Sequence, residues 1–210
     1  MRTIIKRAEP ASLKQHRLST HATYDNYQEK DALRESLVKE QRGLCCYCMN
    51  RIRSDDGKMK IEHWHPQSHR QFLSEQLDYG NLLAACSGNS NGVKHCDTSK
   101  ADQLLSKNPA NHRDRVEEGI HYRPDGEIFS DDATFNAELS NVLNLNANFL
   151  KNNRKAVLDG LIRSLPKIGT ISTGQWNRLL QEWNEGIDSS GLEPFCQVIV
   201  YWLRKKLNRV

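Results

Sequence analysis

The 210-residue sequence has no apolar run long enough to cross a membrane, and its N-terminus lacks the apolar stretch of a signal peptide. It has no internal repeat and no low-complexity linker, and its net charge of +4 is only slightly positive. These absences predict a soluble, cytoplasmic protein with no membrane partner, built as one domain or as a small core with an appendage. The weak charge bias supplies little affinity for nucleic acid, so such affinity is expected to depend on partners.

The sequence does contain six cysteines, and in a reducing cytoplasm clustered cysteines fit metal ligation better than disulfides. Cys45 and Cys48 are spaced C-x-x-C, which lets both sulfurs face one ion from a tight turn. Cys86 and Cys96 are the natural second pair, although nine residues separate them. Together the four predict a structural zinc site.

Alternatives to this ligand set are present in the same segment. Cys46 is a competing thiolate and His95 a competing imidazole. The small polar stretch 87–92 can form an excursion between the second pair of cysteines. The four cysteines could also be unrelated buried residues, because C-x-x-C alone is only a moderate signal. Cys196 lies apart in an apolar stretch and is expected to be an ordinary core residue.

An acid and an imidazole stand side by side at Glu62-His63. They follow the run 58–61, which is predicted to be a short strand, and Pro66 prevents simple continuation of a strand ladder. This pair suits phosphodiester hydrolysis, because the acid can hold a divalent ion while the imidazole takes a proton from the attacking water. The ion neutralises charge on the phosphate.

Asp97 stands at the start of a predicted helix that continues through Ala101, Leu104 and Leu105. It could be a second ligand of the divalent ion or the N-cap of that helix. Its position directly after Cys96 and downstream of the acid–histidine pair favours the ligand.

With these residues the segment 45–100 resembles the HNH endonucleases, whose signature runs from C-x-x-C through an acid–His pair and a central Asn to a second cysteine pair. The resemblance implies a ββα-metal fold, a two-stranded hairpin plus a helix. It implies structural Zn²⁺ on Cys45, Cys48, Cys86 and Cys96, catalytic Mg²⁺ or Mn²⁺ on Glu62 and Asp97, His63 as general base, Asn81 tying down the loop that holds the base, and Lys100 at the closing position of the motif.

The chain departs from the family pattern in three places. The second cysteine pair contains the insertion already described. Asp97 replaces Asn or His and should tighten Mg²⁺ or Mn²⁺ binding, because hard oxygen donors suit these ions. His65 and His69 are extra imidazoles that either join the site or lie on an exposed loop.

The wider chain, roughly 1–165, is similar to one HNH subgroup, the PtuB-type nucleases of Septu anti-phage defence and of retron systems carrying the same pair. The similarity lies in Arg2 to Ile5 with Pro10, a helix before Gly43, and the run 141–146 followed by Arg154. It implies a PtuA-type ATPase partner and, in retron settings, a reverse transcriptase with its reverse-transcribed DNA.

The predicted fold class is α+β and mostly helical, with a ββα-metal core flanked by helices. The expected segments are a helical lead-in (1–44), the nuclease core (45–106), and a hairpin with a helical region (107–210). Periodicity and turn residues predict helices at 26–42 and 146–165, a third around Trp176–Trp183, a last one opened by Pro194, and a hairpin at 120–129.

The helical flank after about residue 140 has two interpretations. Its Trp and Leu residues at helical spacing indicate core packing, or they form a docking surface for the ATPase. Two basic clusters also have two interpretations, because either a solvated helix face or contact with phosphate explains them. These clusters are Lys151/Arg154/Lys155 and Arg204/Lys205/Lys206/Arg209.

The leading functional prediction is a metal-dependent endonuclease that serves as the effector of a defence complex. The main alternative is a non-catalytic zinc module that binds nucleic acid or protein, which leaves Glu62, His63 and Asp97 without a role. A stand-alone restriction-type or homing HNH enzyme is a third, although the short chain has no obvious recognition domain. The motif fits both DNA and RNA, because the site grips a phosphodiester rather than a base.

Overall fold

The computed structural model describes residues 1–55, 57, 59–166, 171–187 and 191–208. The protein is α+β, with helices around small antiparallel sheets. Its α-helices are α1 (Ala11–Arg17), α2 (Lys30–Glu40), α3 (Cys96–Lys100), α4 (Ala133–Ala137), α5 (Asn148–Ser164), α6 (Thr173–Glu185) and α7 (Cys196–Leu207). Its strands are β1 (Met59–His63), β2 (Leu82–Cys86), β3 (Asn89–Ser90), β4 (Val93–Lys94), β5 (His121–Tyr122) and β6 (Ile128–Phe129).

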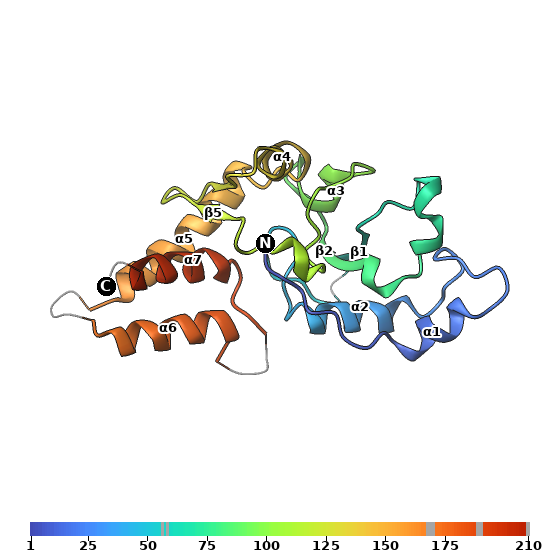
Figure 1. Ribbon diagram of the computed structural model, residues 1–210, viewed down its shortest axis with the longest axis horizontal. Helices are drawn as coiled ribbons and strands as arrows, with labels where there is room; N and C mark the ends of the chain where they lie inside the picture. The colour runs from blue at the N-terminus through green and yellow to red at the C-terminus, as the bar shows by residue number, and fades with distance from the viewer. Residues whose placement is uncertain (56, 58, 167–170, 188–190, 209–210) are drawn as a thin grey trace.

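Figure 1 shows the order of these parts along the long axis of the molecule. Helix α1 lies toward one end and α5, α6 and α7 toward the other, and α2 lies beside β1 and β2 between them. The main buried cluster nevertheless draws on all three predicted segments, from Leu13 through Leu83 to Leu203. The division at 44 and 106 stays a prediction. Among the described residues no helix combines the length and apolarity needed to span a membrane.

Strands β1 and β2 form the antiparallel pair that carries the acid–histidine dipeptide. The register aligns Met59 with Cys86 and His63 with Leu82. The strand predicted at 58–61 is confirmed from Met59 and extends through Glu62 and His63; residue 58 lies outside the described residues. Every residue of β2 is buried, which fits its apolar sequence and fixes the sheet in the core.

The nine residues between Cys86 and Cys96 form a small hairpin, β3 with β4. The His95 N–H donates to the Gly88 carbonyl at 2.9 Å and closes the hairpin. Gly88 has φ +70°, and a Cβ there would stand 2.3 Å from the Thr98 hydroxyl oxygen. The insertion is therefore a hairpin that leaves the cysteine cluster after Cys86 and brings the chain back to it at Cys96.

Helix α3 is shorter than predicted. It ends at Lys100, and Ala101 has φ 48°, which stops the α-helical path. Leu104 and Leu105 lie outside the helix, so the prediction that it continues through them was wrong. The physical reason is that contacts at both ends fix this one turn: the Cys96 N–H donates to the Leu143 carbonyl, and the Lys100 ammonium reaches Glu62.

The hairpin predicted at 120–129 is confirmed as β5 paired with β6, and its turn lies against α5. Gly126 has φ +87°, and a Cβ there would meet the Lys151 carbonyl oxygen at 2.1 Å. Arg154 is 2% exposed; its Nε donates to the Gly126 carbonyl at 2.6 Å and its Nη2 to the Leu145 carbonyl at 2.7 Å. The phosphate-contact interpretation is therefore wrong for Arg154, because the side chain is buried and its Nε and Nη2 groups donate to backbone carbonyls of the protein itself.

The predicted C-terminal helices are also confirmed. Helix α6 begins with a capping box made by Ser172 and Gln175 and ends at Gly186. Trp176 of α6 meets Trp202 of α7 in an edge-on ring contact. The buried positions of α7 belong to the core, which supports the packing interpretation for its apolar side; they include Val198, Ile199 and Leu203. Arg209 lies outside the described residues.

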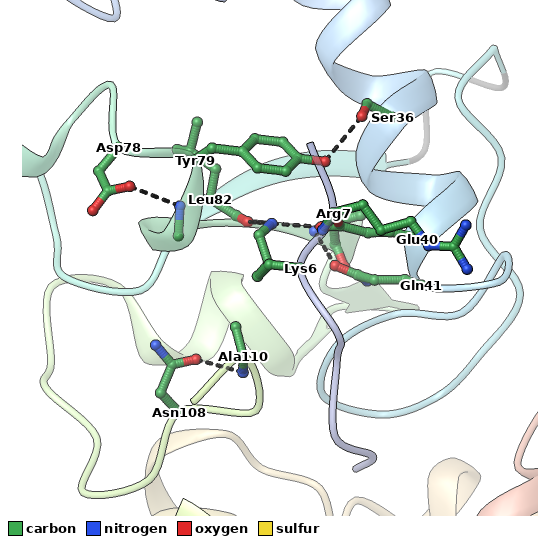
Figure 2. A network of polar contacts seen from close by, with 12 residues as sticks. Lys6, Arg7, Ser36, Glu40, Gln41, Asp78, Tyr79, Leu82, Asn108 and Ala110 are labelled. Atoms are coloured by element: carbon green, nitrogen blue, oxygen red, sulfur yellow. Dashed lines mark hydrogen bonds and ion pairs between the residues drawn. The ribbon is translucent and has the colours of Figure 1, made fainter. Parts of the chain in front are cut away.

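The N-terminal segment reaches β2 through Lys6, as Figure 2 shows. The Lys6 ammonium pairs with Glu40 of α2, donates to the Leu82 carbonyl at 2.8 Å, and lies 3.8 Å from the centre of the Tyr79 ring. The Tyr79 hydroxyl is in turn within 2.9 Å of Ser36 Oγ. These contacts fix the turn Tyr79–Asn81 that leads into β2.

Candidate metal centre and the adjoining acid–histidine site

The four predicted cysteine ligands meet in one buried cluster. Their sulfurs all lie within 4.8 Å of one another; two of the separations are 3.9 Å (Cys45 to Cys96) and 3.8 Å (Cys48 to Cys86). A tetrahedral zinc with Zn–S bonds of about 2.3 Å requires sulfurs about 3.8 Å apart, whereas a disulfide brings them to about 2 Å. The donor set and its spacing therefore fit a closed, four-coordinate metal site.

The first ligand pair sits on a tight knuckle between Leu44 and Arg51, which form a β-bridge. The Cys45 N–H donates to the Asn50 carbonyl at 2.9 Å, and Met49 takes φ 64° so that the chain can turn. The Cys86 N–H donates to the Cys45 sulfur at 3.3 Å. Burial raises the pKa of the Cys45 thiol, but hydrogen bonds from neighbouring cysteines outweigh this and lower it well below its usual value.

The C-terminal region covers the outside of this knuckle. The Leu192 N–H donates to the Arg42 carbonyl at 3.1 Å, and the Phe195 N–H donates to the Met49 carbonyl at 3.0 Å. Leu44, Met49, Leu192 and Cys196 form a second apolar cluster there. Cys196 is thus a core residue, as predicted, and the knuckle is packed on both sides.

The two competing ligands lie beside the cluster but outside it. Cys46 is buried, and its N–H donates to the Ala84 carbonyl of β2. His95 places Nε2 3.5 Å from the Cys86 sulfur and Nδ1 3.3 Å from the Val93 carbonyl oxygen. His95 therefore supports a ligand rather than replacing one, as neighbours of metal ligands commonly do.

Glu62 occupies a buried position where three groups converge on its carboxylate. The side chain is 3% exposed, and Oε1 accepts hydrogen bonds from the Tyr47 hydroxyl at 2.7 Å and the Lys100 ammonium at 2.8 Å. Burial and a hydrogen bond from Asp97 raise the pKa of Glu62 to about 8 against the attraction of Lys100. Two carboxyl groups this close repel each other when both are ionised, so positive charge placed between them would be stabilising.

Asp97 faces the acid from the first turn of α3. The N-cap of α3 is His95, and no side chain caps the helix, so the N-cap alternative for Asp97 was wrong. Its carboxylate lies 3.4 Å from the Lys60 ammonium on β1. Asp97 therefore bridges α3 and β1 at the same end of the site as Glu62.

His63 has a defined tautomer because its Nε2 lies 3.1 Å from the Gln76 carbonyl oxygen. A carbonyl only accepts, so Nε2 carries the hydrogen and the neutral ring keeps the Nδ1 lone pair. Burial lowers the pKa of His63 to about 4, and Tyr24 packs edge-on against the ring at 4.5 Å between centroids. At neutral pH His63 is uncharged, which is the state a base requires.

Asn81 links the segments around His63. Its Oδ1 accepts from the His65 N–H at 2.7 Å, and its Nδ2 donates to the carbonyls of His65 and Glu75, both at 3.2 Å. Its own carbonyl accepts from the Trp64 N–H at 2.9 Å. The Asn81 side chain thus ties the loop that follows β1, at His65, to the end of the short helix Arg70–Glu75.

The extra histidines lie on that same loop. His65 Nδ1 is 2.6 Å from Glu75 Oε2, and its ring stacks on Phe72 with 4.0 Å between centroids. His69 contacts Phe72 from a greater distance, 6.1 Å between centroids. Both imidazoles thus contact Phe72, and His65 also pairs with Glu75, rather than with Glu62 or Asp97.

Two contacts of Glu62 were not foreseen. Tyr47 lies inside the C-x-x-C spacing and was given no role, and Lys100 was singled out only as a motif position. The Lys100 side chain is 1% exposed and also donates to the His63 carbonyl at 3.2 Å. A tyrosine between two metal-binding cysteines was the only available signal for the first contact.

Comparison of the chain with models of known protein families finds no match, and comparison with curated proteins finds none. The functional argument therefore depends on the geometry of the site and on the motif.

Proposed function

We propose that the protein is a metal-dependent HNH-type endonuclease that hydrolyses phosphodiester bonds in nucleic acid. The observation that carries this proposal is the joining of β1, which ends in Glu62 and His63, to α3, which begins with Cys96 and Asp97. Two ion pairs make this junction, Lys100 with Glu62 at 2.8 Å and Lys60 with Asp97 at 3.4 Å. A strand pair followed by a helix, with a cysteine cluster beneath, is the arrangement that the motif implies. A zinc module without catalysis gives Glu62 and Asp97 no purpose.

The structural ion is proposed to be zinc, held by Cys45, Cys48, Cys86 and Cys96. Four thiolates with no open position favour Zn²⁺ over hard cations. In this role the ion ties β2 and α3 to the knuckle, so it supplies folding energy rather than chemistry.

The catalytic ion is proposed to be Mg²⁺ or Mn²⁺, held by oxygens of Glu62 and Asp97. These ions prefer carboxylate oxygens and retain several waters, so two protein carboxylates are a sufficient anchor. The repulsion between the two ionised carboxyl groups described above marks a place where positive charge would be stabilising. When bound, the ion would neutralise charge on the phosphate and on the leaving oxygen.

His63 is proposed to be the general base. Its Nε2–H is held by the Gln76 carbonyl, which polarises the ring and leaves Nδ1 to accept a proton from the attacking water. Asn81 holds the backbone that follows His63, and this restricts the direction in which the ring points. The role of Lys100 is to fix the adjacent acid and the His63 carbonyl.

The test is cleavage by His63→Ala against His112→Ala, the latter at an exposed histidine of the short helix His112–Asp114. Both proteins are assayed with Mg²⁺ on plasmid, tRNA and total RNA, alone and with co-expressed neighbouring proteins. Loss of the base should lower the rate about 10²–10⁴-fold, whereas His112→Ala should cut normally. A His63→Ala protein that cuts at the wild-type rate would contradict the assignment and transfer the role to His65 or His69.

We further propose that the nuclease works within a defence complex with a PtuA-type ATPase, and in a retron setting with a reverse transcriptase and its DNA. This proposal rests on the resemblance of the wider chain. Because the charge bias is weak, the isolated chain should cleave poorly and gain activity on assembly. Robust, unregulated cleavage by the purified chain would contradict it.

The docking surface for the ATPase must use exposed groups, because the apolar side of α7 is already packed. Deleting residues 193–210 would therefore damage the core rather than test docking. The exposed Lys205 and Lys206, which lie over the rings of Tyr201 and Trp202, give a cleaner test. Changing both lysines to Glu should weaken co-purification with the ATPase while leaving zinc content unchanged; unaltered co-purification would place the docking surface elsewhere.

A further inference from the structure

Tyr47 connects the cysteine cluster to the acid of the proposed metal site. It lies between Cys46 and Cys48 on the knuckle, its ring is completely buried, and its hydroxyl donates to Glu62 Oε1 at 2.7 Å. The backbone of Tyr47 therefore moves with the zinc ligands, while the end of its side chain moves with Glu62. Among the described residues of the knuckle, Tyr47 is the one that donates a hydrogen bond to this carboxylate.

We propose that Tyr47 is a positioning residue that transmits the rigidity of the zinc knuckle to Glu62 and so sets the affinity of the divalent-cation site. The proposal rests on the proposed function, because it requires Glu62 to hold a divalent cation. Under this proposal the zinc knuckle affects cation binding at Glu62 through Tyr47, and not through a contact between the zinc ligands and Glu62.

The physical argument concerns the freedom of the Glu62 carboxylate. A glutamate side chain rotates about three bonds, and a ligand that must first be oriented binds an ion more weakly. Oε1 accepts from Tyr47 and from Lys100, so Oε2 is left as the oxygen without these donors. Tyrosine has only two rotatable bonds, and its ring is fixed by packing, so its hydroxyl is a better fixed point than a long ammonium chain.

The expected loss of Mn²⁺ affinity can be taken from side chains that hydrogen-bond to metal ligands in other proteins. Removing such a supporting hydrogen bond typically weakens metal affinity or activity about 10–100-fold. Tyr47→Phe deletes one buried oxygen and keeps the ring. We therefore expect about tenfold weaker Mn²⁺ binding, with about one zinc per chain retained. A residue that only packed would not alter Mn²⁺ affinity in a folded, zinc-loaded protein.

Tyr27→Phe is the matched control. Tyr27 is also buried, and its hydroxyl lies 2.8 Å from Ser12 Oγ, remote from Glu62. Zinc-loaded wild type, Tyr47→Phe, Tyr27→Phe and Glu62→Gln are titrated with Mn²⁺, and free Mn²⁺ is followed by electron paramagnetic resonance. Weaker binding in Tyr47→Phe, wild-type binding in Tyr27→Phe and near-complete loss in Glu62→Gln would support the proposal.

The outcomes separate this proposal from the proposed function. If wild type binds Mn²⁺ through Glu62 and Tyr47→Phe binds it within twofold of wild type, the positioning role is overturned and the cation site stands. If wild type binds no Mn²⁺, or Glu62→Gln binds it normally, the cation site itself falls and the positioning role with it.

A second measurement covers the case in which Tyr47→Phe does not fold. Wild-type protein labelled with 3-fluorotyrosine is titrated with Mg²⁺ and followed by ¹⁹F magnetic resonance. One tyrosine resonance should shift in wild type and stay fixed in Glu62→Gln, because the hydroxyl of Tyr47 contacts the carboxylate that takes up the ion. Absence of any resonance that depends on Glu62 in this way would overturn the proposal.

Discussion

Replacing Gly88 by alanine should move Cys96 away from Cys86 in the four-cysteine cluster. Gly88 is the second residue of the insertion between Cys86 and Cys96, and its carbonyl accepts the His95 N–H that closes the hairpin. An added Cβ would stand 2.3 Å from Thr98 Oγ1 and 2.7 Å from the His95 carbonyl oxygen. The second clash is with backbone, so no side-chain rotation relieves it.

The expected cost has two parts. A non-glycine residue at positive φ costs about 1–2 kcal/mol, and forcing extra volume into a packed site costs about 1–3 kcal/mol. Gly88→Ala should therefore lower the free energy of unfolding by about 2–5 kcal/mol. Gly92 in the same hairpin has φ +83° but nothing within 4 Å of its would-be Cβ, so Gly92→Ala should cost only about 1–2 kcal/mol.

The assay is urea unfolding of both zinc-loaded variants, together with the rate at which a chelating dye removes their zinc. Gly88→Ala should unfold at lower urea and release zinc faster than Gly92→Ala, because the shift moves Cys96 relative to Cys86. Equal unfolding free energies for the two variants would refute the reasoning, since backbone strain alone would then explain both.

Cys45→Ser should lose the single zinc per chain and fold poorly, whereas Cys46→Ser should keep it, as elemental analysis after gel filtration can establish. His63 has its pKa lowered from 6.5 to about 4 in the folded state, so the unfolded chain binds the extra proton first as pH falls from 6.5 towards 4. Acidification from pH 7 to 5 should therefore cost wild type about 2 kcal/mol more stability than His63→Gln; parallel stability–pH curves would contradict this. Arg154→Met strands two buried carbonyls and should cost about 2–4 kcal/mol in thermal or urea unfolding, while Lys155→Met on the exposed side should change stability by less than about 0.5 kcal/mol.

The parts of the fold that were predictable are those whose signals are local. The period of apolar residues sufficed for α5, and Gly186 marked the end of α6. The cysteine pairing was predictable across the insertion because four thiolates have few alternatives to a common ion. The acid–histidine dipeptide was placed at a strand end by the residues on either side of it.

The parts that were not predictable depend on residues far apart in the sequence. Helix α3 stops after one turn because Lys100 is drawn to Glu62, and no propensity of residues 96–105 encodes that contact. Arg154 sits in a basic run typical of a solvated face, yet the hairpin turn at Gly126 supplies the carbonyls that bury it. Tyr47 and Glu62 are joined only because the knuckle folds over β1.

The docking of Leu192 and Phe195 on the knuckle has a consequence for the timing of maturation during synthesis. A nascent chain reaching just beyond Cys96 already carries all four thiolates and can capture zinc, but Leu44 and Met49 are then uncovered. Because N-terminal parts emerge first at about 5–20 residues per second, the knuckle waits several seconds for its cover after all four thiolates are present. Proteolysis of ribosome-stalled chains should show the knuckle becoming resistant only once residue 195 has emerged, so protection of the knuckle lags behind its capacity to bind a metal ion.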